Sequence, residues 1–216
     1  MHPTLMRPMH ALLRLAGLRC RRTSQPIVRP PSLEPIHLSS ARVLADRDHL
    51  LGLVPIGSRV AEVGVGFGDF SRKILDVVKP CEFVAVDLFE RHASHEASYR
   101  RRFNREIEDG IVQIRRGWSH DVLEQLRDDY FDLIYIDAGH SYERVKQDVD
   151  EGRRKVRPGG LLAMDDYERS DPSGFTLYGV KRAAHELCLS ERWKVAYVAL
   201  EGADAAANVV LQRPTA

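Results

Sequence analysis

Short apolar runs alternate with amphipathic helical stretches along most of this sequence, and this alternation limits the fold more than any other feature. The apolar runs have the length of β-strands and cover residues 60–63, 83–86, 111–114, 133–136 and 161–164. Helical patterns fill the intervals between them, at residues 70–78, 95–107, 122–126 and 142–156. Strand, helix, strand at this spacing predicts βαβ units, and therefore a parallel sheet with helices on both faces.

The C-terminal part of the chain departs from this alternation. After a predicted helix at residues 180–189, apolar segments at 193–200 and 207–211 follow without an intervening helix, which predicts an antiparallel pair. The predicted fold class is therefore α/β. We expect a doubly wound, Rossmann-like, mostly parallel sheet of seven strands with an antiparallel edge strand and helices on both faces.

The first 38 residues differ in composition from the rest, and we predict an extension at 1–38 before a domain at 39–216. Residues 1–33 contain six arginines and no acidic residue, and four prolines between residues 25 and 35 exclude a regular helix there. This composition fits a transit peptide, but we favour an N-terminal arm or lid on a cytoplasmic protein. The domain is expected to begin with a helix at residues 41–51, capped by Ser39 or Ser40.

Composition argues against several classes of protein. No apolar run reaches the roughly 18 to 20 residues of a membrane-spanning helix, so no membrane partner is expected. The three cysteines are widely separated and form no CxxC pair, which argues against a disulfide framework or structural zinc. Beyond residue 33 the chain has 26 basic and 31 acidic residues, so nucleic acid is not expected as a partner.

A glycine-rich turn joins the first predicted strand to the first predicted helix. Gly64, Gly66 and Gly68 let the chain turn sharply and let a ligand approach the main chain where the helix begins. The spacing is GxGxG, whereas dinucleotide-binding proteins use GxGxxG, and Asp69 occupies the place of the third glycine. Asp87 ends the second predicted strand, 23 residues after Gly64, where a carboxylate can reach ribose hydroxyls. These features predict a nucleoside-containing ligand whose other end is neutral or cationic, which disfavours a nicotinamide-dependent oxidoreductase.

Three aspartates follow the ends of two neighbouring strands. Asp137 ends the strand at 133–136, and Asp165 and Asp166 end the strand at 161–164, so the carboxylates are expected to converge. Three converging carboxylates repel one another unless a cation neutralises them, and oxygen ligands favour Mg²⁺. The alternative is that these aspartates only cap the strand ends.

These motifs resemble the class I S-adenosylmethionine-dependent methyltransferases, from about residue 41 to the C-terminus. The stretch Gly117 to Asp121 is similar to the GxSxD stretch that borders adenine in catechol O-methyltransferases. Trp118 would stack on the base or serve only packing, and His120 would hydrogen-bond the base edge. The resemblance implies cofactor-binding roles for Glu62, Gly64, Gly66, Gly68, Asp87, Trp118, Ser119, His120 and Asp137.

The IDxxHxY and GGxxxxDDY motifs resemble more narrowly the metal-dependent macrocin and aminocoumarin sugar O-methyltransferases. This resemblance implies that Asp137, Asp165 and Asp166 hold Mg²⁺ and that the acceptor is a hydroxyl of a small polar molecule. Either Asp137 or His140 would take the hydroxyl proton. A metal-independent methyltransferase and a non-catalytic cofactor-binding protein remain alternatives, and the sequence leaves open whether copies of the chain associate.

Overall fold

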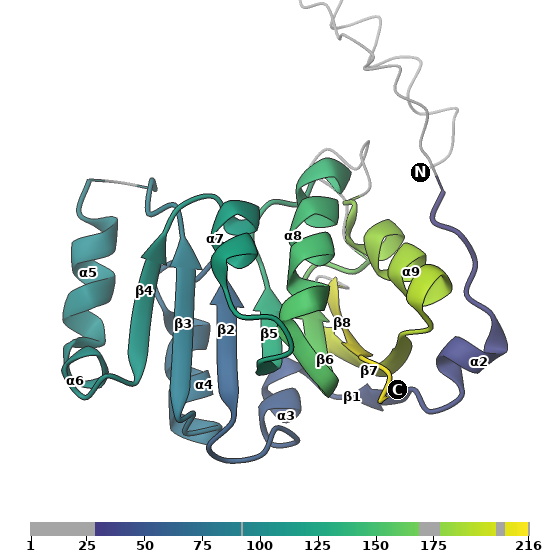
Figure 1. Ribbon diagram of the computed structural model, residues 1–216, viewed down its shortest axis with the longest axis horizontal. Helices are drawn as coiled ribbons and strands as arrows, with labels where there is room; N and C mark the ends of the chain where they lie inside the picture. The colour runs from purple at the N-terminus through teal and green to yellow at the C-terminus, as the bar shows by residue number, and fades with distance from the viewer. Residues whose placement is uncertain (1–28, 92, 169–177, 202–205, 216) are drawn as a thin grey trace, which may run out of the picture.

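An eight-stranded sheet forms the centre of the computed structural model, which describes residues 29–91, 93–168, 178–201 and 206–215 (Figure 1). The basic leader at 1–28 therefore lies outside the described residues. The strands are β1 (Arg42–Leu44), β2 (Arg59–Val63), β3 (Glu82–Asp87), β4 (Val112–Arg116), β5 (Phe131–Ile136), β6 (Val156–Met164), β7 (Lys194–Glu201) and β8 (Ala206–Gln212).

The strands are arranged in the order β1-β7-β8-β6-β5-β2-β3-β4. All neighbouring strands run parallel except β8, which pairs antiparallel with both β6 and β7. This arrangement confirms the predicted mostly parallel sheet with an antiparallel C-terminal pair. The described part of the chain contains eight strands, one more than the seven predicted. The additional strand is β1.

The expected helix at residues 41–51 is partly wrong, because its first residues form β1 and only α3 (Arg47–Leu51) is helical. Asp46 caps α3, and its side chain accepts a hydrogen bond from the His49 N–H (3.0 Å). The helix therefore begins after Asp46 and not after Ser39 or Ser40. Residues of β1 are extended because they pair with β7, which lies near the other end of the sequence.

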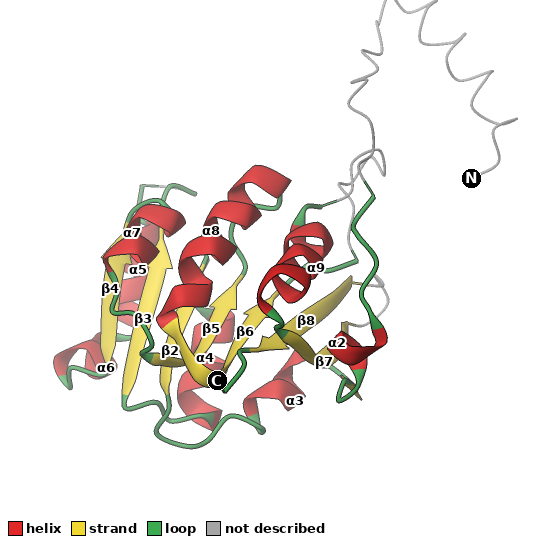
Figure 2. Cartoon of the chain, turned by 45° about the vertical axis from the view of Figure 1, so that its right-hand side comes forward, coloured by secondary structure: helices red, strands yellow, loops and turns green. Residues whose placement is uncertain are grey.

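Helices cover both faces of the sheet (Figures 1 and 2). One face packs against α3, α4 (Asp69–Val77) and α5 (His95–Arg102), and the other against α7 (Ser119–Gln125), α8 (Tyr142–Lys155) and α9 (Val180–Glu191). The predicted helix at 95–107 is broken at buried Phe103, after which α6 (Asn104–Glu108) begins. None of the helices in the described ranges is long and apolar enough to cross a membrane.

The strand residues alternate between the two cores, as β geometry requires. Ala61 and Val63 of β2 belong to the core under α7, α8 and α9, whereas Val60 belongs to the core under α3, α4 and α5. The strand order reverses at β2. The chain continues from β2 to β3 and β4 on one side of β2, and then crosses to β5 on the other side of β2. Ligands of open α/β sheets bind at the carboxyl ends of the strands at such a reversal.

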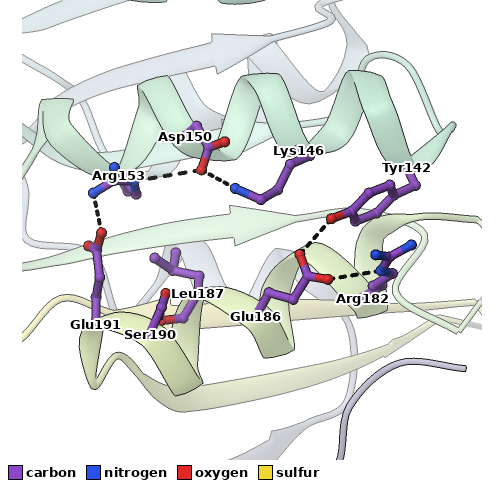
Figure 3. Close-up of polar contacts among 9 residues, drawn as sticks. All are labelled: Tyr142, Lys146, Asp150, Arg153, Arg182, Glu186, Leu187, Ser190 and Glu191. Carbon is purple, nitrogen blue, oxygen red and sulfur yellow. Dashed lines mark hydrogen bonds and ion pairs between the residues drawn. The ribbon is translucent and has the colours of Figure 1, made fainter.

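Polar contacts connect α8 to α9 (Figure 3), and Val149 of α8 and Leu187 of α9 belong to the same hydrophobic core. Arg153 pairs with Glu191 across the two helices, and the Tyr142 hydroxyl donates to Glu186 (2.7 Å). These contacts fix α8, whose N-terminus follows the end of β5.

The end of the predicted N-terminal extension packs on the domain. The Pro31 carbonyl oxygen and His185 Nδ1 of α9 lie at hydrogen-bond distance (2.5 Å), and Leu33 contacts the core beneath α9. His37, in the short helix α2 (Pro35–Leu38), is buried. Contacts with the domain therefore begin before the predicted boundary at residue 39.

Leu33→Ala should lower the free energy of unfolding by about 1 kcal/mol, because it removes apolar area that the α9 core buries. For a chain of this size the melting temperature should fall by about 2 to 4 °C. Leu38→Ala is the matched control, since Leu38 is 47% exposed and should change stability by less than about 0.5 kcal/mol. Equal melting temperatures for the two variants would contradict the packing of this segment.

Candidate active site

Main-chain hydrogen bonds continue past the strand ends and hold the predicted site residues in one row. The Gly64 N–H donates to a β3 carbonyl (2.8 Å), the Asp137 N–H to a β2 carbonyl (2.8 Å), and the Asp165 N–H to a β5 carbonyl (3.0 Å). The ends of β3, β2, β5 and β6 are thus in register at the edge where the topology reverses.

A cavity of about 570 Å³ opens at this edge. The predicted cofactor residues that line it are Gly64, Asp87, Trp118, Ser119, His120 and Asp137. The cavity also has lining residues that the sequence analysis missed, namely Val86, Leu88, Glu90, Arg91, Gly117, Ala138, Gly139, Arg144 and Gln147. A pocket of this size and polarity accommodates a nucleoside-sized ligand.

Gly64 is required by the close approach of two turns. Its φ is +89°, and a Cβ placed there would overlap the carbonyl oxygen of Asp137. Gly68 serves packing instead, because a Cβ there would overlap the rings of Tyr99 and Phe103. The turn after β2 is therefore pressed against the turn after β5 on one side and against α5 on the other.

Asp87 connects the glycine turn to the end of β3. One carboxylate oxygen accepts the Gly66 N–H (3.0 Å) and the other accepts the Phe89 N–H (2.7 Å). Each carboxylate oxygen has a second lone pair, so both can also accept a ribose hydroxyl. Asp87 lines the cavity, as expected for a ribose-binding residue.

His95 holds the same turn from α5 and was not identified from the sequence. Its Nε2 lies 2.7 Å from the Gly66 carbonyl oxygen, and the side chain is fully buried. The ring contacts Phe67 and Phe89, at centroid distances of 5.0 and 5.2 Å. No local sequence signal identifies this histidine, because Gly66 lies 29 residues before it.

Glu62 lies behind the turn and is only 2% exposed. It accepts a hydrogen bond from the Ser71 hydroxyl (2.6 Å), which in turn accepts one from the Tyr99 hydroxyl (3.0 Å). Burial raises the pKa of Glu62 from 4.5 to about 8, although the Ser71 hydrogen bond opposes the rise. Glu62 therefore supports the turn mainly as a neutral acid at pH 7.

Trp118 and Arg144 form the end of the cavity that the sequence assigns to adenine. The guanidinium carbon of Arg144 lies 4.8 Å from the centre of the half-exposed Trp118 ring. The methylene groups of Arg144 pack against Gly139, so the side chain bridges the turns after β4 and β5. Trp118 thus has a cation–π contact, which orients the ring at the cavity wall.

The three predicted metal ligands are placed in two groups. Burial, with the neighbouring carboxylates of Asp165 and Asp166, raises the pKa of Asp137 from 3.8 to about 7. The Arg47 guanidinium opposes this rise and donates to Asp165 Oδ2 (3.3 Å). Asp166 Oδ2 instead lies 3.2 Å from His140 Nδ1.

The described ranges contain no group of three or more Asp, Glu, His or Cys side chains arranged to hold a metal ion. Asp165 Oδ1 is buried without a hydrogen-bond partner, but Arg47 contacts the other oxygen of Asp165 and His140 contacts Asp166. As placed, these residues do not fit Mg²⁺, and the magnesium site stays a prediction.

His140 is fixed at the start of α8. Its ring stacks on Tyr178 with a centroid distance of 4.7 Å and an angle of 14°, and its carbonyl accepts the Gly179 N–H (2.8 Å). Tyr178 ends the segment 167–178, whose tyrosines and arginine make it a sequence candidate for binding a polar acceptor, and residues 169–177 lie outside the described residues. His140 therefore lies between Asp166 and Tyr178.

The strand order and the position of this site define a Rossmann-like methyltransferase fold. Residues 61–167, from β2 to the turn after β6, match the family described as "Methyltransferase domain". Nearly half of the chain is therefore similar to this family, and the fold is one that solved methyltransferase structures share. A search of curated proteins found no significantly similar sequence, and the narrower resemblance to sugar and catechol enzymes is not confirmed.

Solved structures share the fold at low sequence identity. A candidate O-methyltransferase from Klebsiella pneumoniae is 18% identical, with a TM-score of 0.60 over 99% of this chain and 91% of that chain. The N-methyltransferase NodS from Bradyrhizobium japonicum WM9 is 17% identical, with a TM-score of 0.56 over 78% and 93%. Aeropyrum pernix fibrillarin, with natively bound S-adenosyl-L-methionine, is 14% identical, with a TM-score of 0.55 over 76% and 73%. The acceptor atoms in the first two names differ, so the fold does not identify the acceptor.

Replacing Glu62 should change how stability depends on pH. Glu62 holds its proton in the folded chain up to about pH 8 but ionises near 4.5 when unfolded, so its contribution to stability falls as pH rises through this window. The unfolding free energy of Glu62→Gln should therefore fall less steeply with pH than that of wild type, by about 1 kcal/mol per pH unit. Urea unfolding across that pH range measures the two slopes. Exposed Glu108→Gln is the control and should leave the slope unchanged. Parallel slopes for wild type and Glu62→Gln would mean that Glu62 is ionised in the folded state.

Proposed function

We propose that this chain transfers the methyl group of S-adenosylmethionine to a hydroxyl oxygen of a small polar acceptor. One observation carries the proposal: the cavity lined by Asp87 and Asp137 lies at the same strand edge as a cluster with a histidine and buried carboxylates. The first part suits a nucleoside and the second suits proton removal from an acceptor.

The cofactor half rests on the glycine turn and Asp87. Both oxygens of Asp87 have capacity for the ribose hydroxyls, and the carboxyl groups of Glu90 and Asp137 also line the cavity. S-adenosylmethionine carries a positive sulfonium and no phosphate, so a wall with these carboxyl groups suits it better than a dinucleotide. The absence of the GxGxxG spacing has the same implication.

The acceptor half rests on His140. Its Nδ1 faces the Asp166 carboxylate, which favours the tautomer with the proton on Nδ1 and leaves Nε2 able to accept a proton. The sulfonium is already a good leaving group, so the chain must align the acceptor oxygen with the methyl carbon and remove the hydroxyl proton. His140 is the proposed base, and Asp166 and Tyr178 orient its ring.

Asp87→Asn should weaken S-adenosylmethionine binding by about 1 to 3 kcal/mol, or roughly 5- to 150-fold, because an amide loses one charge-assisted acceptor. Isothermal titration calorimetry measures this directly. Asp69→Asn is the matched control near the same turn, since the Asp69 side chain is 84% exposed and pairs with Arg102. Wild-type chain that binds NADH but not S-adenosylmethionine would instead support an oxidoreductase.

His140→Asn should lower kcat by about 10²- to 10⁴-fold while S-adenosylmethionine affinity stays nearly unchanged, as expected for loss of a general base. The assay follows a labelled methyl group from the cofactor onto a panel of sugars, catechols and amines. His49→Asn is the control, because His49 also pairs through Nδ1 with an aspartate but is exposed on α3. Methylation of amines without methylation of any hydroxyl compound would contradict the proposed acceptor class.

A further inference from the structure

Arg47 lies among the acidic residues of the acceptor side, although it comes from the short helix α3. Its guanidinium nitrogen donates to the Tyr135 hydroxyl (3.1 Å) and to Asp165 Oδ2 (3.3 Å), and its guanidinium carbon lies 4.8 Å from the centre of the Phe70 ring. The Tyr135 hydroxyl in turn donates to buried Asn208 (2.6 Å). Contacts from β5, from the residue after β6 and from α4 therefore hold this cation in one position, and β8 holds Tyr135.

Side chains of the chain itself contact two carboxylates of the cluster. Arg47 forms an ion pair with Asp165, and His140 Nδ1 lies 3.2 Å from Asp166 Oδ2. The side chain of Asp165 is only 13% exposed and that of Arg47 only 28%, so solvent screens their attraction weakly. A divalent ion bound to Asp165 would lie close to a guanidinium that stays protonated at any physiological pH, and the two cations would repel each other.

We propose that Arg47 is the resident cation of the acceptor site, taking the place beside Asp165 that the sequence assigned to Mg²⁺, so that methyl transfer requires no metal. Arg47 acts as a positioning residue: it holds Asp165 by one carboxylate oxygen and so fixes this carboxylate beside Asp137. This inference rests on the proposed function and concerns the same site.

Metal binding gives the first test. Wild type and Asp165→Asn, each with S-adenosylhomocysteine, are titrated with Mn²⁺ as a paramagnetic substitute for Mg²⁺, and free Mn²⁺ is followed by electron paramagnetic resonance. We expect the two proteins to bind Mn²⁺ alike and wild-type turnover to be unchanged by excess chelator. A bound Mn²⁺ that Asp165→Asn loses, or turnover that chelator abolishes and Mg²⁺ restores, would overturn the proposal.

Replacement of Arg47 gives the second test. Arg47→Ala should lower kcat by at least ~10-fold, while cofactor affinity stays within ~2-fold of wild type. Arg47→Lys should retain part of the activity, because lysine keeps the positive charge but lacks the planar N–H donors of the guanidinium. Added guanidinium ion should partly restore turnover to Arg47→Ala, an effect that a purely structural role would not produce. Full turnover of Arg47→Ala would overturn the proposal, and the metal titration decides it if that variant does not fold.

Arg59→Ala is the matched control. Arg59 also stacks on an aromatic ring, 4.6 Å from the centre of Tyr130, but it begins β2 at the opposite end of the sheet. Its loss should leave turnover unchanged, and guanidinium should have no effect. Binding of S-adenosylhomocysteine to wild type is measured first: no binding would overturn the proposed function, whereas binding combined with metal dependence would overturn only the role of Arg47.

Discussion

The main-chain hydrogen bonds beyond the strand ends are the constraint on which the rest of the site depends. They continue the parallel ladder past β2, β3, β5 and β6, so the residues that follow these strands lie in one row at fixed spacing. The glycine turn can lie in this row only because Gly64 has no side chain where it meets the Asp137 carbonyl. The residues proposed for the cofactor and those proposed for the acceptor thus lie along one wall, which would place a methyl donor beside its acceptor.

The acidic residues along this row are stabilised in different ways, and the differences follow from their surroundings. Glu62 is buried behind the turn and keeps its proton, whereas Asp87 remains available to a ligand because two main-chain N–H groups support its carboxylate. Asp165 is paired with a guanidinium, and Asp166 lies beside an imidazole. Each buried carboxyl group therefore has a polar partner of its own.

The parallel core and the glycine turn could be predicted because their signals are local: continuous apolar runs, glycines after a strand, and an acid at the next strand end. β1 could not be predicted, since Arg42 and Val43 are exposed and the strand forms only by pairing with β7. Arg47 fell within a predicted helix, but its contact with Asp165 spans 118 residues, and neither residue type nor spacing indicates it. The spacing of the carboxylates alone could not distinguish a side-chain cation from a bound metal ion, because either one would relieve the repulsion between the carboxylates.

The contact between Gly64 and Asp137 also limits how such a chain can be altered by recombination. Segments 63–66 and 136–138 fit each other through main-chain atoms, so a segment taken from a relative with a different turn would collide unless its counterpart came with it. In any such exchange the two turns must therefore be inherited as a pair.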